Sequence, residues 1–115
     1  MSDGHTITID KAAGTISVKW QGHTIARTTS ALELREASYP PVFYIPRADA
    51  DMAYLERTTR ETTCPYKGIA NYFTLTADGI SDANAVWTYE QPKQGVGEIA
   101  GHLAFYPDKV EIVRA

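Results

Sequence analysis

Apolar and polar residues alternate along much of the chain, as in the run from Thr15 to Trp20, where Ile16 and Val18 fall on one face with Trp20. This period of two is typical of strands with one buried face. Short strands are therefore predicted over residues 6–10, 15–20, 23–29, 31–36, 42–45, 57–63, 69–76, 85–89, 103–106 and 110–113.

One short helix is expected after Pro46. The carboxylate of Asp49 can cap this helix, and Asp51 adds negative charge to its first turn. Met52 and Leu55 share a face at a spacing of three residues, which gives the helix an apolar side. The pattern predicts about two helical turns before the next strand.

The segments between the strands predict the connections and the fold class. Residues 77–84 and 91–101 are expected to be loops, and Pro107-Asp108-Lys109 is expected to join the last two strands as a hairpin. Many short strands with one short helix indicate a mainly β fold, either an antiparallel two-sheet sandwich or an open barrel. A length of 115 residues with 43% hydrophobic residues fits a single domain over residues 1–115.

Charge and cysteine content narrow the function classes. The formal charge of -3 provides no sequence-wide basic footprint, so neither nucleic acid nor a membrane is an expected partner. One cysteine cannot form an intramolecular disulfide. The polar residues 1–5 lack an apolar signal region, and no later apolar run approaches membrane-spanning length. A cytoplasmic protein is therefore expected.

Residues 62–68, with the sequence Thr-Thr-Cys-Pro-Tyr-Lys-Gly, contain the single cysteine of the chain. Cys64 to Lys67 fits a type I β-turn with proline at its second position, and Gly68 can take the positive φ of a bulge. Cys64 is a candidate catalytic nucleophile if Lys67 stabilises its thiolate, with His102 as a candidate base. The alternative is that Cys64 is a small buried hydrophobic residue.

Two cations are candidates for binding a small molecule that carries negative charge. Lys67 offers a point charge and Arg47 a planar fork, and together they can hold a phosphate or a carboxylate. Glu36 and Asp49 are the candidate polar neighbours of these cations. The alternative is that each cation is solvated on the surface or pairs with Glu36 or Asp49.

Aromatic residues at strand spacing are candidates for the walls of the same pocket. Tyr44, Tyr72 and Trp87 are the residues expected to line it, and Tyr89 is a further candidate. Large aromatic side chains provide broad contact surfaces, and tyrosine and tryptophan add a polar group. The alternative is that these residues belong to the hydrophobic core, which is where aromatics on strands are most often found.

Several runs of sequence together carry a family resemblance. They are Ala-Leu-Glu-Leu-Arg-Glu at 31–36, Val-Phe-Tyr-Ile-Pro-Arg at 42–47, Thr-Cys-Pro-Tyr-Lys-Gly-Ile-Ala-Asn-Tyr at 63–72 and Ala-Phe-Tyr-Pro-Asp at 104–108. The chain closely resembles domain-of-unknown-function family 427 over about residues 16–113, most specifically in its Cys-Pro-Tyr-Lys-Gly run. The resemblance implies a β-tent fold, two antiparallel sheets pinned at an angle, similar to B-type methionine sulfoxide reductases and the ligand-binding domain of cereblon. Some catalogues label the family nucleotidyltransferase.

The sequence departs from the metal and nucleotide chemistry that such a resemblance suggests. Zinc-bearing β-tent proteins use paired Cys-x-x-Cys motifs, and a single cysteine excludes a four-cysteine zinc site. Nucleotidyl transfer needs paired carboxylates for magnesium beside a phosphate-binding loop. Asp49 and Asp51 have a suitable spacing, but helix capping explains them, and the glycines of 95–101 do not match the dinucleotide motif. No metal and no cofactor are expected.

The leading hypothesis is a small-ligand-binding domain with a pocket near the Thr-Cys-Pro-Tyr-Lys-Gly turn. It requires Arg47 and Lys67 to lie on the same side of the molecule, where they would recognise a polar and anionic group. The first alternative is an enzyme, either one using Cys64 as a nucleophile or a nucleotidyltransferase. The second alternative is a structural or interaction module without a pocket, marked by an exposed apolar patch.

Overall fold

The computed structural model describes residues 6–115, so the polar segment 1–5 lies outside the described residues. Its strands are β1 (Ile7–Lys11), β2 (Ile16–Trp20), β3 (His23–Thr28), β4 (Leu32–Glu36), β5 (Val42–Tyr44), β6 (Leu55–Cys64), β7 (Gly68–Ala77), β8 (Ile80–Thr88), β9 (Leu103–Phe105) and β10 (Glu111–Arg114). Three single 3-10 turns are η1 (Arg47–Asp49), η2 (Met52–Tyr54) and η3 (Gly97–Ile99). No helix within residues 6–115 is long and apolar enough to cross a membrane.

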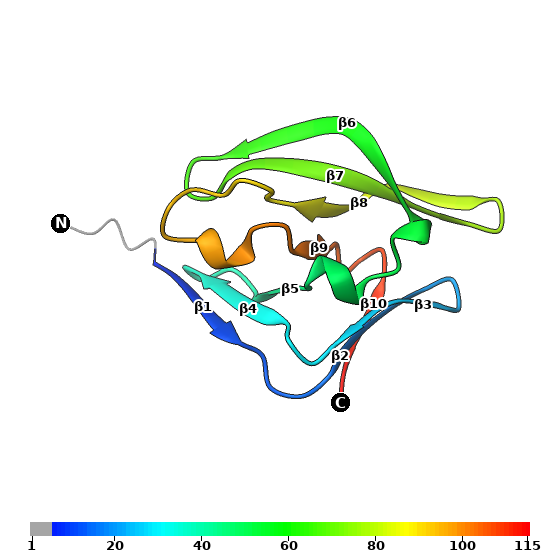
Figure 1. Cartoon of the computed structure of the whole chain (residues 1–115), viewed down its shortest axis with the longest axis horizontal. Coiled ribbons are helices and arrows are strands. Elements are labelled where there is room, and N and C mark those ends of the chain that lie inside the picture. The colour runs from blue at the N-terminus through cyan, green and yellow to red at the C-terminus, as the bar shows by residue number, and fades with distance from the viewer. Residues whose placement is uncertain (1–5) are drawn as a thin grey trace.

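The strands form three antiparallel sheets (Figure 1). Their strand orders are β1-β4-β5, β10-β2-β3 and β6-β7-β8-β9. The prediction of a mainly β antiparallel fold is confirmed, and the part of the chain described by the structure forms no closed barrel. The strands are divided among three sheets, whereas the sequence predicted two.

A short bridge joins two of these sheets. The Ile45 N–H donates to the Leu103 carbonyl at 2.7 Å, and the Leu103 N–H donates to the Ile45 carbonyl at 2.8 Å. The sheets β1-β4-β5 and β6-β7-β8-β9 diverge from this bridge as two walls (Figure 1). This arrangement fits the angled sheets that the β-tent resemblance implies.

Two apolar clusters occupy opposite faces of the four-stranded sheet. Phe73 and Val86 pack in a cluster with residues of β2 and β3, whereas Tyr72 packs in a second cluster with Tyr44 and Leu34. Successive residues of a strand point to opposite faces, so the neighbours Tyr72 and Phe73 necessarily enter different clusters. The second cluster lies between the two walls and borders the candidate site.

The prediction of a loop over residues 77–84 is wrong. β7 continues to Ala77 and β8 begins at Ile80, so only Asp78 and Gly79 connect them. Both turn residues have positive φ, 56° and 77° respectively, as a type I′ hairpin turn requires. The Asp-Gly pair was the sequence signal for this turn, and the polar residues after it belong to a strand.

The prediction of a closing hairpin around Pro107-Asp108-Lys109 is also wrong. β9 pairs with β8, while β10 pairs with β2 in a different sheet. Alternation identifies both segments as strands, but it does not specify their partners. The consequence is that Tyr106, immediately after β9, lies beside β8 and not in a two-stranded ribbon.

The predicted helix is replaced by the two separate 3-10 turns η1 and η2. Asp51, and not Asp49, provides the cap, because its carboxylate accepts a hydrogen bond from a backbone N–H of η2 at 3.1 Å. The Asp49 carboxylate instead accepts from the Thr28 hydroxyl at 2.7 Å. Between the turns, Ala50 is extended and bridges to Ala26 of β3. This tertiary pairing interrupts the helix that the local sequence favours.

Candidate functional site

The Cys-Pro-Tyr-Lys-Gly segment joins β6 to β7 as a tight turn. Cys64 pairs with Gly68, whose φ of +112° is the positive value expected for it. Lys93 anchors the turn from outside: its backbone N–H donates to the Lys67 carbonyl at 2.9 Å and its ammonium to the Pro65 carbonyl at 2.8 Å. These contacts fix the backbone from which the Cys64 and Lys67 side chains extend.

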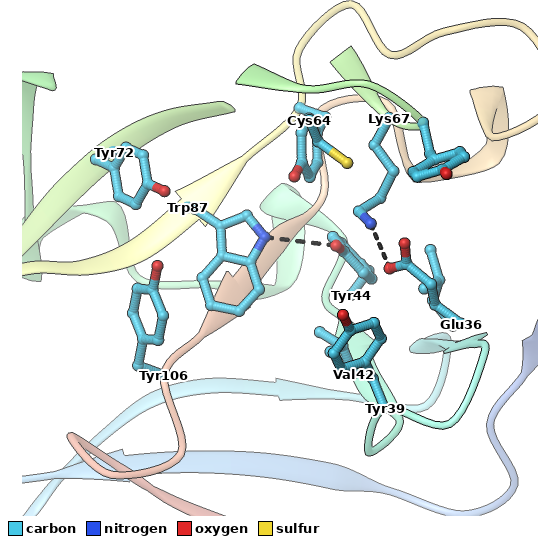
Figure 2. A pocket seen from close by; sticks show the side chains of 12 residues that line it. Glu36, Tyr39, Val42, Tyr44, Cys64, Lys67, Tyr72, Trp87 and Tyr106 are labelled. Atoms are coloured by element: carbon cyan, nitrogen blue, oxygen red, sulfur yellow. Dashed lines mark hydrogen bonds and ion pairs between the residues drawn. The ribbon is translucent and has the colours of Figure 1, made fainter. Parts of the chain in front are cut away.

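A cleft of about 470 Å³ lies between the two walls, beside this turn (Figure 2). It is lined by Leu34, Glu36, Tyr39, Val42, Tyr44, Cys64, Tyr66, Lys67, Tyr72, Trp87, Tyr89 and Tyr106. Six of the seven tyrosines in the chain therefore line one cavity. A concave, mostly apolar surface with a few fixed polar groups is the usual form of a small-molecule site.

The charged lining residues are Lys67 and Glu36, which pair with each other and are called the cleft pair below. The Lys67 Nζ lies 2.5 Å from the Glu36 Oε1, and the two side chains are only 10% and 15% exposed. Glu36 ends β4 and Lys67 belongs to the turn, so the pair connects the two walls. Charges removed from water are tolerated when they stay paired, and the aromatic cavity thus contains an electrically neutral pair.

Tyr44 and Trp87 hold each other in place within the cleft. The Trp87 indole N–H donates to the Tyr44 hydroxyl at 3.4 Å, and the rings meet edge to face with centroids 6.5 Å apart. Burial raises the pKa of Tyr44 to about 12, and burial also raises the pKa of Tyr89. Both phenols therefore remain neutral near pH 7, where they act as hydrogen-bonding groups on an apolar wall.

Tyr72 and Tyr106 form a second group of hydroxyls in the cleft. The Tyr72 hydroxyl lies 2.8 Å from the Thr62 Oγ1, and the Arg60 guanidinium lies 5.1 Å from the centre of the Tyr72 ring. Burial raises the pKa of Tyr72, but its hydrogen bonds and the charge of Arg60 lower it overall. Burial and the hydrogen bond to Tyr72 raise the pKa of Tyr106 to about 12. Tyr72 is thus the more acidic member of this pair.

Cys64 is partly exposed and its sulfur points into the cleft, towards Lys67 and Tyr44 (Figure 2). The candidate base His102 lies elsewhere, with its Nδ1 3.1 Å from the Ala100 carbonyl. The described residues that line the cleft therefore include no histidine. A nucleophilic role for Cys64 stays a prediction, whereas its position inside the cleft is a structural fact.

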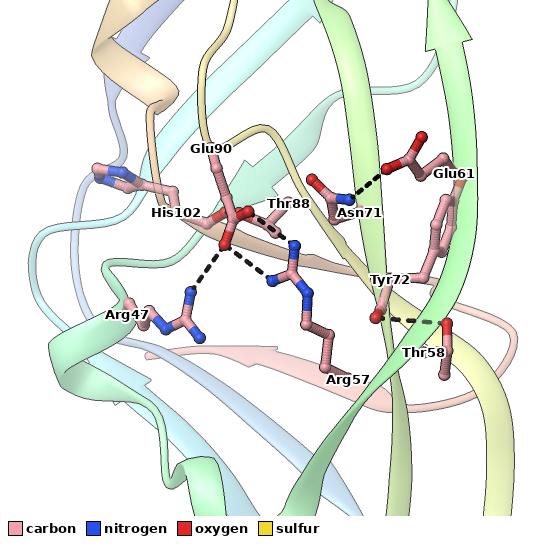
Figure 3. Close-up of polar contacts among 9 residues, drawn as sticks. All are labelled: Arg47, Arg57, Thr58, Glu61, Asn71, Tyr72, Thr88, Glu90 and His102. Atoms are coloured by element: carbon pink, nitrogen blue, oxygen red, sulfur yellow. Dashed lines mark hydrogen bonds and ion pairs between the residues drawn. The ribbon is translucent and has the colours of Figure 1, made fainter.

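Arg47 and Asp49 do not join the cleft. The guanidiniums of Arg47 and Arg57 lie over the Phe73 ring, 5.3 and 5.9 Å from its centre. Both guanidiniums also bind the Glu90 carboxylate (Figure 3). Arg47, Arg57 and Glu90 are called the arginine cluster below. Because Phe73 faces away from Tyr72, the cluster lies on the opposite face of β7 from the cleft. The expected pairing of Arg47 with Lys67 in one site is therefore wrong.

The sequence interpretation missed three cleft tyrosines, Tyr39, Tyr66 and Tyr106. Tyr66 lies in the Cys-Pro-Tyr-Lys-Gly run and Tyr106 in the Ala-Phe-Tyr-Pro-Asp run, both of which carry the family resemblance. Their position in these runs was the sequence signal that could have identified both tyrosines as site residues. Tyr39 follows β4 in a segment that the sequence marks only as a loop, and nothing local connects it to the turn.

The features considered for nucleotide chemistry have structural roles. The carboxylates of Asp49 and Asp51 bind the Thr28 hydroxyl and a backbone N–H of η2. The glycine-containing segment 95–101 contains only the single turn η3. Within residues 6–115, no group of three or more histidine, cysteine, aspartate or glutamate side chains is arranged to hold a metal ion.

Comparison with known proteins agrees with the motifs and the fold. A family model described as a domain of unknown function, DUF427, matches residues 8–115, and its label, NTP_transf_9, carries the nucleotidyltransferase name. A search of curated proteins found no match. The matched region covers nearly the whole chain, including every strand that lines the cleft. The chain therefore belongs to the DUF427 family.

Proposed function

We propose that this DUF427 domain binds a small, ring-containing organic molecule in the tyrosine-lined cleft. The observation that carries the proposal is the convergence of six of the seven tyrosines, together with Trp87, on one cavity. Aromatic side chains give a large contact area for a small loss of conformational entropy. The volume of about 470 Å³ falls in the range of small-molecule sites.

The exposed aromatic residues support this proposal over an interaction module. Tyr39, Tyr66 and Tyr106 are 66%, 42% and 37% exposed, and all three belong to the cleft lining. Some of the large apolar residues exposed on the described surface therefore lie around the cleft. A docking surface for a protein would more simply present them as a continuous patch.

A thermal-shift screen of metabolites tests the proposal. A molecule at a hundred times its dissociation constant stabilises the folded state by about 2.7 kcal/mol. In a domain of this size, the melting temperature should rise by on the order of 10 °C. The proposal is abandoned if a broad set of ring-containing metabolites, tested at millimolar concentration, produces no reproducible rise.

A matched pair of variants shows whether a stabilising compound acts in the cleft. Tyr106→Ser removes a ring from the cleft, whereas Tyr54→Ser changes the one tyrosine outside it, whose hydroxyl lies 3.2 Å from the His23 Nδ1. We expect the compound's shift to shrink in Tyr106→Ser and to persist in Tyr54→Ser. Equal shifts in both variants would place the binding site elsewhere.

A further inference from the structure

The described residues that line the cleft carry no net formal charge, although two of them are charged. Lys67 and Glu36 contribute one positive and one negative charge, and they already neutralise each other at 2.5 Å. The remaining lining residues are tyrosine, tryptophan, leucine, valine and cysteine. Arg60 stacks on Tyr72 but is not itself a lining residue. The ligand therefore meets a balanced pair, not an isolated cation.

A ligand with net charge would disturb this balance. An anion beside Lys67 would also face the Glu36 carboxylate, and a cation beside Glu36 would face the Lys67 ammonium. Both side chains are at most 15% exposed, so water screens these repulsions weakly. A charge moved from water into such a site needs an opposite partner of its own, and the described lining residues offer no charged group besides the cleft pair.

A neutral polar group can use the cleft pair without separating it. An ammonium has more than one N–H donor, and a carboxylate can accept several hydrogen bonds. A ligand acceptor can thus bind Lys67 while a ligand donor binds Glu36. Since the Lys67 Nζ and the Glu36 Oε1 are 2.5 Å apart, the acceptor and donor must lie at one edge of the ligand.

We infer, building on the proposed function, that the ligand is a neutral flat ring with an acceptor and a donor at one edge. The ring lies among the aromatic walls near Trp87, and its polar edge contacts the cleft pair. This replaces the anionic ligand expected from the sequence, because that expectation relied on Arg47 joining Lys67. A ring amide and a ring hydroxyl both present such an edge, and the probes below separate them.

Fragment binding to the intact domain, followed by NMR of the indole N–H signals, tests the inference. 2-Pyridone offers adjacent C=O and N–H groups, phenol a hydroxyl, N-methyl-2-pyridone an acceptor alone, and benzoate a negative charge. Trp87 reports on the cleft, while Trp20, whose indole donates to Asp82 at 2.6 Å, is the internal reference. We expect 2-pyridone or phenol to shift only the Trp87 signal, and to bind about tenfold more tightly than the other two probes.

Changing the charge of the cleft should change the ranking of the probes. Glu36→Gln leaves a net positive cleft, and we expect benzoate to become the preferred probe. Glu33→Gln is the matched control, because Glu33 is also on β4, is 13% exposed and pairs with Arg35 outside the cleft. Lys67→Gln leaves a net negative cleft, and we expect this variant to prefer benzylammonium. The Lys67→Gln variant still tests the inference if Glu36→Gln does not fold.

Each contrary result has a distinct meaning. Tightest binding of benzoate to the wild-type domain would overturn the inference but leave the proposed function in place. If 2-pyridone and N-methyl-2-pyridone bound equally and phenol bound no more tightly, the ligand would need no hydrogen-bond donor. That result would also overturn the inference. Failure of all the probes to shift Trp87 would reject this ligand class, while the metabolite screen would still decide whether the cleft binds any small molecule.

Discussion

The two faces of β7 carry similar chemical groups in different surroundings. On one face, the cleft pair lies among aromatic rings, with side chains 10% and 15% exposed. On the other face, the arginine cluster covers the Phe73 ring, with Arg47, Arg57 and Glu90 between 36% and 47% exposed. Both sites combine an aromatic residue, a cation and a carboxylate. They differ chiefly in their contact with water.

Several hydrogen bonds hold the arginine cluster together. Arg57 binds Glu90 through two contacts of 2.9 and 3.0 Å, and these hydrogen bonds raise the pKa of Arg57 and lower that of Glu90. Exposed ion pairs are nevertheless weak, because water and salt screen them. The comparison teaches that enclosure from water distinguishes the candidate ligand site from a surface network.

Removal of one cation from each site should have the largest effect on this comparison. Lys67→Ala removes the Lys67 ammonium from the Glu36 carboxylate, whose side chain is only 15% exposed, and we expect it to lower the free energy of unfolding by about 3 kcal/mol. Arg47→Ala removes an exposed contact, and we expect a loss of at most about 1 kcal/mol. Urea denaturation measures both values.

The double variant Lys67→Met with Glu36→Gln is the control for this experiment. It removes both charges while retaining side chains of similar length, so most of the stability lost in Lys67→Ala should return. Equal losses in Lys67→Ala and Arg47→Ala would mean that the cleft pair is no more enclosed than the arginine cluster.

Alkaline pH should selectively weaken the cleft side. Burial holds the pKa of Tyr44 at about 12, above its ordinary value of 10.0. Below pH 10 the Tyr44 phenol is neutral in both the folded and the unfolded protein. Between pH 10 and 12 this phenol ionises chiefly in the unfolded protein. Stability should therefore fall by about 3 kcal/mol over this range. Denaturation across the range should show a shallower fall in Tyr44→Phe than in wild type, and equal slopes would refute this assignment to Tyr44.

Acid pH should affect the arginine cluster, but only slightly. The hydrogen bond from Arg57 lowers the pKa of Glu90 below its ordinary 4.5, so its stabilisation is present above that pH and is lost as pH falls through the folded-state pKa. Since Glu90 is 36% exposed, we expect a loss below about 1 kcal/mol that shrinks further in salt. Denaturation of the wild-type domain and of Glu90→Gln at several acid pH values measures this loss of stability. The same pH dependence in both proteins would contradict its assignment to Glu90.

The sequence predicts local structure well here and long-range assembly poorly. Alternation around Ile16 and Val18 identifies β2, and Gly68 takes its expected positive φ, because neighbouring residues determine both features. The partner of β10 and the failure of the predicted helix depend on contacts between distant segments. The same distinction applies to the candidate site. Lys67 and Cys64 were predicted from the local turn motif, whereas the position of Arg47 away from the cleft depends on which face of β7 it covers.

Protection of Cys64 from alkylation tests the central claim most directly. This residue is the only cysteine and its sulfur points into the cleft, so each alkylation event reports on that cavity. Its rate near neutral pH, compared with free cysteine, also tests the enzyme alternative, since an unactivated thiol should react no faster. A compound found by thermal shift should slow alkylation in proportion to its occupancy, while still stabilising Cys64→Ser. An unchanged alkylation rate at saturating compound would contradict binding in the cleft.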